Sequence, residues 1–141
     1  PVLCILWRIG MTLSDASGLL NTSDFPLVCL NPNQMVPGYA TNWKGEMTAL
    51  LERGTPFALI YPPAPEEDHE DRKERGLWLK TNREPLSRLC RVMILIEPDA
   101  IRRSALEKMF PGTERAFGVP QMATATKTEA EILARHALAS R

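Results

Sequence analysis

The chain has 141 residues, of which 44% are hydrophobic and 24% are charged, with 17 Lys plus Arg against 17 Asp plus Glu. This length supplies one hydrophobic core, so we expect a single domain over residues 1–141. The balanced charge lacks the basic excess of most nucleic-acid-binding domains. No apolar run reaches the roughly 20 residues of a membrane helix. We therefore expect neither nucleic acid nor a membrane as a partner.

The three cysteines, Cys4, Cys29 and Cys90, lie in or beside apolar runs, and none belongs to a C-x-x-C pair. Buried, reduced thiols of this kind are typical of cytoplasmic proteins. The two histidines, His69 and His136, have no metal-ligand spacing. We expect a cytoplasmic protein with no bound metal. The sequence contains neither of the two common phosphate-binding motifs, so we also expect no nucleotide cofactor.

Apolar runs predict strands and helically spaced apolar residues predict helices, with proline and glycine between them. In chain order the predicted elements are strands Val2–Ile9 and Phe25–Leu30, helix Thr41–Arg53, strand Pro56–Tyr61, helix Pro65–Glu84, strand Val92–Ile96, helix Pro98–Phe110, strand Arg115–Val119 and helix Thr128–Leu138. The polar stretch Gly10–Phe25 predicts a connection with one helical turn at Ala16–Leu20. Pro85 is expected to kink or end the second helix.

The resulting order is β-β-α-β-α-β-α-β-α. Alternation of strands and helices is typical of right-handed βαβ units. The strands Pro56–Tyr61 and Val92–Ile96 are almost wholly apolar, as strands covered on both faces are. The sequence therefore predicts one small α/β domain with a mostly parallel or mixed five-stranded sheet and about four helices.

This element order resembles that of the STAS family, the anti-sigma-factor-antagonist type of domain, although no sequence motif carries the likeness. The resemblance implies a small regulatory domain that is cytosolic or appended to a transporter. Regulatory members carry a phosphorylatable Ser or Thr where the third strand meets its helix. Here that stretch is Tyr61-Pro62-Pro63-Ala64-Pro65-Glu66, in which Tyr61 has the one hydroxyl, so a phosphorylation switch of the family's kind is not expected.

Ligands of open parallel sheets bind beyond the carboxyl ends of the strands. This rule selects the residues that follow each predicted strand, and those with polar side chains that we take as candidates are Asn31, Tyr61, Glu97 and Asp99. Glu97 and Asp99 would bring two carboxylates to one rim, where they could act as an acid and a base. The alternative is that Asp99 caps a helix and Glu97 is solvated.

Basic side chains and one glycine of the long predicted helix form a second candidate surface, at His69, Arg72, Gly76, Lys80 and Arg83. These residues follow one another at steps of three or four, which places them along one helix face. A mid-helix glycine costs about 1 kcal/mol relative to alanine, so Gly76 indicates close approach by a ligand, a partner or another helix. The alternative is a solvated face with i,i+4 ion pairs.

No convergent catalytic set stands out. Pro1 at the start of a strand is similar to the tautomerase superfamily, but the duplicated β-α-β units of that superfamily are missing here. We therefore predict a non-enzymatic binding or regulatory module that acts through the charged helix face on a protein partner or a small anionic ligand. The alternative is a small enzyme or ligand binder at the carboxyl edge of the sheet. The oligomeric state is left open.

Overall fold

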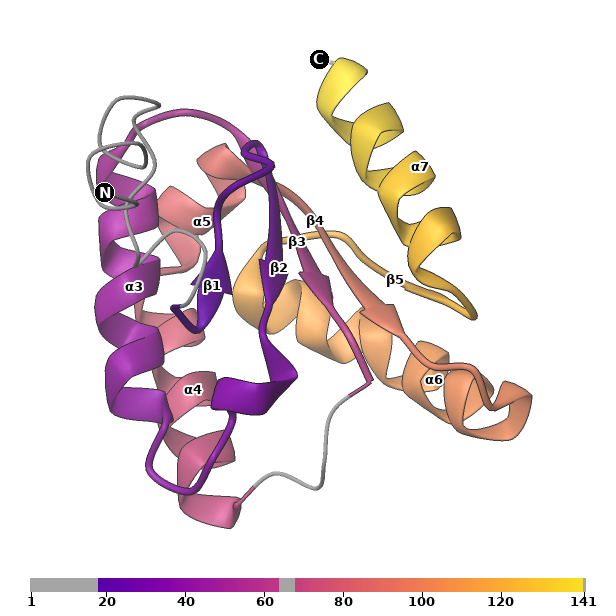
Figure 1. Ribbon diagram of the computed structural model, residues 1–141, viewed down its shortest axis with the longest axis horizontal. Coiled ribbons are helices and arrows are strands. Elements are labelled where there is room, and N and C mark those ends of the chain that lie inside the picture. Colours follow the sequence, from indigo (N-terminus) through magenta and orange to yellow (C-terminus); the bar gives the residue numbers. More distant parts are fainter. Residues whose placement is uncertain (1–17, 64–67, 141) are drawn as a thin grey trace, which may run out of the picture.

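The five strands lie side by side in chain order, β1-β2-β3-β4-β5, in the computed structural model, which describes residues 18–63 and 68–140 (Figure 1). The strands are β1 Leu20–Asn21, β2 Leu27–Leu30, β3 Phe57–Tyr61, β4 Cys90–Ile96 and β5 Gln121–Thr124. β1 is antiparallel to β2, and every other neighbouring pair is parallel. This arrangement confirms the predicted α/β class and the five-stranded mixed sheet.

The first strand of this sheet is not the predicted one. Pro1 and the predicted strand Val2–Ile9 lie outside the described residues. β1 lies in the stretch that was predicted to be connection, and Leu20 is strand rather than helical turn. The backbone N–H groups of Leu19 and Leu20 donate to the Glu46 carboxylate, at 3.2 and 2.9 Å. A two-residue strand held by a distant side chain has no periodicity that a sequence could reveal.

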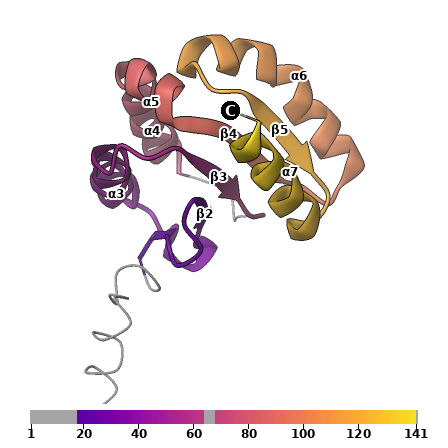
Figure 2. The same ribbon diagram turned by 90° about the horizontal axis from the view of Figure 1, so that it is seen from above.

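Five α-helices occur in the described residues, against about four predicted. They are α3 Ala40–Glu52, α4 His69–Thr81, α5 Arg83–Leu89, α6 Ala100–Phe117 and α7 Lys127–Ala139, with a short 3-10 helix, η1, at Pro32–Gln34. Of these five helices, α3 to α6 lie on one face of the sheet and α7 lies on the other (Figure 2). Helices therefore cover both faces of the sheet, as the apolar central strands predicted.

Alternate residues of the central strands supply two separate cores. Phe57 and Leu59 of β3 pack under α3, α4 and α5, while Ala58 and Ile60 face α7. Trp43 of α3 is completely buried in the first core, and its ring meets that of Trp78 edge-on at 5.2 Å between centroids. This contact joins α3 to α4, so the position of α4 depends on the core beneath α3.

The long helix predicted over Pro65–Glu84 is divided into α4 and α5, and its predicted start at Pro65 lies outside the described residues. α4 begins at His69, because the Asp68 side chain accepts the Glu70 N–H at 3.1 Å as an N-cap. α4 ends at Thr81, and its C-cap is Asn82, whose backbone and side-chain nitrogens both donate to the Trp78 carbonyl at 2.9 Å.

Pro85 was predicted to kink or end this helix, but Asn82 makes the break. Pro85 is the third residue of α5. A proline is accepted in the first turn of a helix, where its missing N–H has no helical partner.

The fifth predicted strand, Arg115–Val119, is wrong. α6 continues through Pro111 to Phe117, and β5 begins later, at Gln121. Pro111 and Gly112 lie on the exposed side of α6, where solvent can satisfy the carbonyl that proline leaves without a donor. The helix ends at Gly118, which has the left-handed φ of 74° that suits a glycine C-cap.

Candidate functional site

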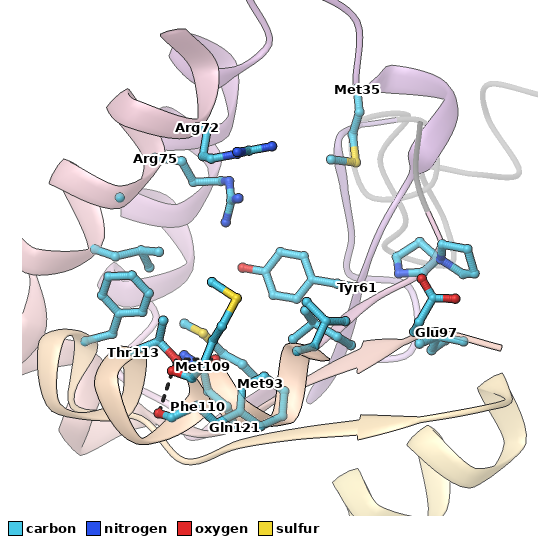
Figure 3. A pocket seen from close by; sticks show the side chains of 18 residues that line it. Met35, Tyr61, Arg72, Arg75, Met93, Glu97, Met109, Phe110, Thr113 and Gln121 are labelled. Carbon is cyan, nitrogen blue, oxygen red and sulfur yellow. Dashed lines mark hydrogen bonds between the residues drawn. The ribbon is translucent and has the colours of Figure 1, made fainter. Parts of the chain in front are cut away.

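A cavity of about 610 Å³ lies between α4 and α6, above the carboxyl halves of β3 and β4 (Figure 3). Its floor is formed by the sheet, where the register places Tyr61 beside Leu95 and Met93 beside Gln121. Its walls come from the two helices and its rim from the loops that follow β2, β3 and β4. The wall and rim residues are Met35, Pro62, Pro63, Arg72, Arg75, Gly76, Leu79, Ile96, Glu97, Leu106, Met109, Phe110, Thr113 and Phe117.

The cavity exists because neither neighbouring helix covers this part of the sheet. Gly76 faces it, and a Cβ built on Gly76 would meet no atom within 4 Å. The glycine therefore does not allow another helix to pack closely, which was one of its predicted roles. Protein interiors are close-packed, and voids larger than a water molecule are few. A space of this size lies within the range of small-molecule binding sites, about 300–1,000 Å³.

The lining is mostly apolar and adaptable. Met35, Met93 and Met109 reach it from the loop after β2, from the sheet and from α6 (Figure 3). Met109 is 60% exposed, so it stands at the opening rather than in the core. Flexible thioether side chains can adjust to ligands of different shape. The cavity is suited to an apolar body whose outline need not be rigid.

Two cations and a hydroxyl enter the cavity from facing elements. Arg72 and Arg75 come from α4 and Tyr61 comes from β3, and their polar ends turn toward the same space in Figure 3. Each of the three already takes part in an interaction within the protein. A guanidinium has five N–H donors, so an existing partner still leaves donors for a bound anion. This side of the cavity can receive a negative charge.

The base of the cavity is held by a hydrogen-bonded corner. The Thr113 hydroxyl donates to the Gln121 side-chain oxygen at 2.9 Å, which joins α6 to β5. The Gln121 backbone N–H donates to the Glu114 carboxylate at 2.9 Å. Gln121 is thus held by both its side chain and its backbone, and this fixes α6 against the edge strand rather than over the cavity.

The two carboxylates predicted to share a rim have different roles. Glu97 lines the cavity, on the far side of Tyr61 from the arginines in Figure 3, and its carboxylate accepts the Asp99 backbone N–H at 2.9 Å. Asp99 caps α6 and does not line the cavity. Its carboxylate accepts the Arg102 N–H at 2.9 Å, and this bond lowers the pKa of Asp99 below its ordinary value. The alternative expectation for Asp99, a helix cap, matches this geometry.

The predicted helix stripe is divided by the end of α4. Arg72 and Gly76 line the cavity, whereas His69 and Lys80 are exposed and lie outside its lining. Arg83 belongs to α5, and its Nε donates to the Arg115 carbonyl at 3.0 Å. Arg83 therefore fastens α5 to the end of α6.

Asn31 lies apart from the cavity. Its side chain accepts the Asn33 N–H at 3.1 Å and so caps η1. Of the nine predicted site residues, the structure thus brings four together, Tyr61, Arg72, Gly76 and Glu97, and they come from both of the surfaces that the sequence suggested.

Several lining residues were missed by sequence reasoning. Arg75 follows Arg72 by three residues and precedes Leu79 by four, so it shares their helix face and that spacing could have selected it. Thr113 and Phe117 were out of reach, because the predicted helix ended at Phe110. Because α6 ends seven residues later, at Phe117, both fall on the side that faces the sheet.

In the part of the chain that the structure describes, no cluster of three His, Cys, Asp or Glu side chains is placed to hold a metal ion. Within the same ranges, no helix combines the length and the apolar character needed to cross a bilayer. Comparison of the chain with protein-family models, with curated proteins and with solved structures finds no match in any of the three.

Proposed function

We propose that this protein is a non-catalytic, regulatory binding module whose ligand is a small molecule held in the cavity between α4 and α6. The observation that carries the proposal is a largely apolar cavity of about 610 Å³ with Arg72, Arg75 and Tyr61 at one side. This combination of an apolar lining with a few convergent polar groups is the common form of a ligand site. It joins the two surfaces, helix face and sheet edge, that the sequence suggested separately.

The side chains around the cavity favour binding over catalysis. The described lining contains no histidine, cysteine or serine, the residues that most often act as bases or nucleophiles. Among the described lining residues Glu97 is the one acidic group, and its carboxylate accepts the backbone N–H of Asp99. A change in the position of α6 when the cavity fills is the simplest way for such a module to signal, since α6 forms one wall.

A STAS-like identity forms part of this proposal and is supported by the element order. In that family the junction of the third strand with its helix is the regulatory position. Here the corresponding residues Tyr61, Pro62 and Pro63 line the cavity. We infer that ligand occupancy replaces phosphorylation as the regulatory event. A cytoplasmic location belongs to the same proposal, and the free thiols of Cys29 and Cys90 favour it.

The test uses a pair of glycine variants. Gly76→Phe places a ring in the cavity, whereas Gly45→Phe places the same ring on the exposed side of α3, where a Cβ also meets no atom within 4 Å. Each purified protein is incubated with a mixture of cellular metabolites and examined by native mass spectrometry. We expect the wild type and Gly45→Phe to retain a saturable small molecule that Gly76→Phe does not.

A thermal unfolding series with the retained compound completes the experiment. At about 100 times its dissociation constant, a ligand of the native state adds about 2.7 kcal/mol of stability. The proposal is wrong if the wild type retains no small molecule, or if Gly76→Phe retains it as well as Gly45→Phe does.

A further inference from the structure

We propose that the ligand of this cavity is an organic anion with an apolar body, whose acid group lies between Arg72 and Arg75 and whose body lies across Gly76 toward Phe110 and Phe117. This inference rests on the proposed function and names the chemical class of its ligand. It follows from the separation of charge from apolar surface within one cavity.

The charged end is defined by the two arginines. Arg72 and Arg75 are three residues apart on α4, so their side chains leave the helix on neighbouring lines and converge on one space. Planar guanidinium groups hold carboxylate, sulfonate and phosphate oxygens through paired N–H donors. Tyr61 faces them from β3 and can donate a further hydrogen bond to the same anion. Glu97, which would repel an anion, is separated from Arg72 and Arg75 by Tyr61 in Figure 3.

The apolar end of the cavity is formed by buried side chains of α4 and α6. Phe110 is only 8% exposed and Leu79 only 1%, so the far walls are dry and offer aromatic and aliphatic surface. Gly76 leaves the α4 backbone bare between the arginines and Leu79. A ligand body can therefore contact the α4 backbone at Gly76, where any other residue would place a side chain in the cavity.

A free inorganic anion does not satisfy this cavity, because it would leave the apolar walls uncovered. A neutral apolar molecule would cover the walls and displace water from the guanidinium groups of Arg72 and Arg75, but it would bring no acceptor for the N–H donors that face the cavity. An amphipathic anion meets both requirements, since its charge lies near the half-exposed mouth and its body enters the dry part.

Two fluorescent probes test the class of ligand. Anilinonaphthalene sulfonate carries an acid group on an aromatic body, and phenylnaphthylamine has the same ring system without the acid. We expect both to bind at one site, and the sulfonate to bind more tightly. Arg72→Gln and Arg75→Gln should each weaken the sulfonate about fivefold, as expected for a partly exposed charge pair. The neutral probe should change less than about twofold.

Lys73→Gln is the matched control, because it removes the same charge from an exposed position of α4 outside the lining. It should leave both probes unchanged, and near-ultraviolet circular dichroism should show that every variant keeps its native packing. Added salt should weaken the sulfonate and spare the neutral probe.

The outcomes separate this inference from the proposed function. If phenylnaphthylamine binds and Gly76→Phe abolishes its binding, but the sulfonate binds no more tightly and ignores both arginine variants, then the anionic class is wrong while the cavity stays a ligand site. If neither probe binds saturably to the wild type, the proposed function is wrong as well. An equal loss of sulfonate affinity in Lys73→Gln and in Arg75→Gln would also overturn the inference.

Discussion

The carboxylate of Asp71 on α4 accepts the backbone N–H of Ala40, the first residue of α3, at 3.1 Å. Its second oxygen accepts the Gly38 N–H at 2.8 Å. Asp71 is 4% exposed, so one buried side chain caps a neighbouring helix and holds the loop before it. Met35 in the same loop and Arg72 beside Asp71 both line the cavity. The bond pair therefore ties the rim of the site to its charged wall.

Replacing Asp71 by Ala should destabilise the protein by about 2–4 kcal/mol, because the buried N–H of Ala40 and the partly buried N–H of Gly38 both lose a charged acceptor. Asp71→Asn should also cost stability, since an amide offers one acceptor oxygen where two N–H donors arrive. Urea unfolding at neutral pH measures both effects. Lys73→Ala on the exposed side of α4 is the control, and a loss below about 0.5 kcal/mol is expected there. An equal effect of the Asp71 and Lys73 variants would contradict the capping role.

Gly118→Ala should cost more stability than Gly54→Ala. Both glycines have left-handed φ angles, 74° and 68°, which cost an alanine about 1 kcal/mol. A Cβ on Gly54 meets no atom within 4 Å, whereas a Cβ on Gly118 would lie 3.0 Å from Cγ of Arg83. We expect about 1 kcal/mol for Gly54→Ala and about 2 kcal/mol for Gly118→Ala.

A double variant isolates this contact. Because Arg83→Ala removes the nearest of the atoms that the new Cβ would meet and leaves only Cβ of Ser87 at 3.3 Å among the three nearest, Gly118→Ala should cost less in that background than in the wild type. Denaturant midpoints of the four proteins give the coupling. Strict additivity would mean that the clash at Arg83 contributes nothing.

Alkaline pH should destabilise the protein through Cys90. Burial raises the pKa of this thiol to about 12, whereas an unfolded cysteine has a pKa near 8.5. A raised folded-state pKa means that the stability is fully present below the unfolded value and is lost as pH rises toward the folded one. The advantage of the wild type over Cys90→Ala should shrink by about 2 kcal/mol between pH 8 and pH 10.

Urea titrations at the two pH values measure the change for Cys90. Cys29 offers a comparison, because burial also raises its pKa but the side chain is only half-buried. Cys29→Ala should show a smaller effect. A difference between wild type and Cys90→Ala that does not vary with pH would mean that the thiol is ionised as easily in the folded protein as in the unfolded chain.

Acid pH should weaken the start of α6 through Asp99. The hydrogen bond from the Arg102 N–H lowers the pKa of Asp99, so the ionised form contributes stability above the unfolded pKa near 4. That contribution is lost as pH falls through the lower folded value. Asp99→Asn keeps an acceptor at the cap without a charge, so the wild type should be favoured at pH 6 and lose its advantage by pH 2. If the difference in stability between the wild type and Asp99→Asn stayed constant from pH 6 to pH 2, the carboxylate charge could not be its cause.

The parts of the fold that could be predicted are those in which local pattern and tertiary environment agree. The all-apolar runs that became β3 and β4 are buried on both faces, so their composition alone indicated central parallel strands. α3 and α7 carry apolar residues at helical spacing and were predicted to within a few residues.

The parts that could not be predicted depend on contacts between distant residues. β1 is held by Glu46 of α3, and α6 passes Pro111 because the exposed side of the helix tolerates the proline. For the site, the strand-end rule selected Tyr61 and Glu97, and helical spacing selected Arg72 and Gly76. Nothing in the sequence showed that the two sets meet, since that depends on α6 lying along β5 and leaving the sheet open beside α4.

In the described residues one helix, α7, covers the second face of the sheet, and it follows all five strands in the chain. Synthesis completes β2, β3 and β4 before it reaches the 13 residues of α7. During that interval the apolar side chains that α7 buries in the folded protein, such as Ile60 and Ile94, are exposed to solvent. Exposed apolar surface of this kind promotes association between chains. A chain terminated before Lys127 would therefore be expected to aggregate rather than to persist as a partly folded monomer.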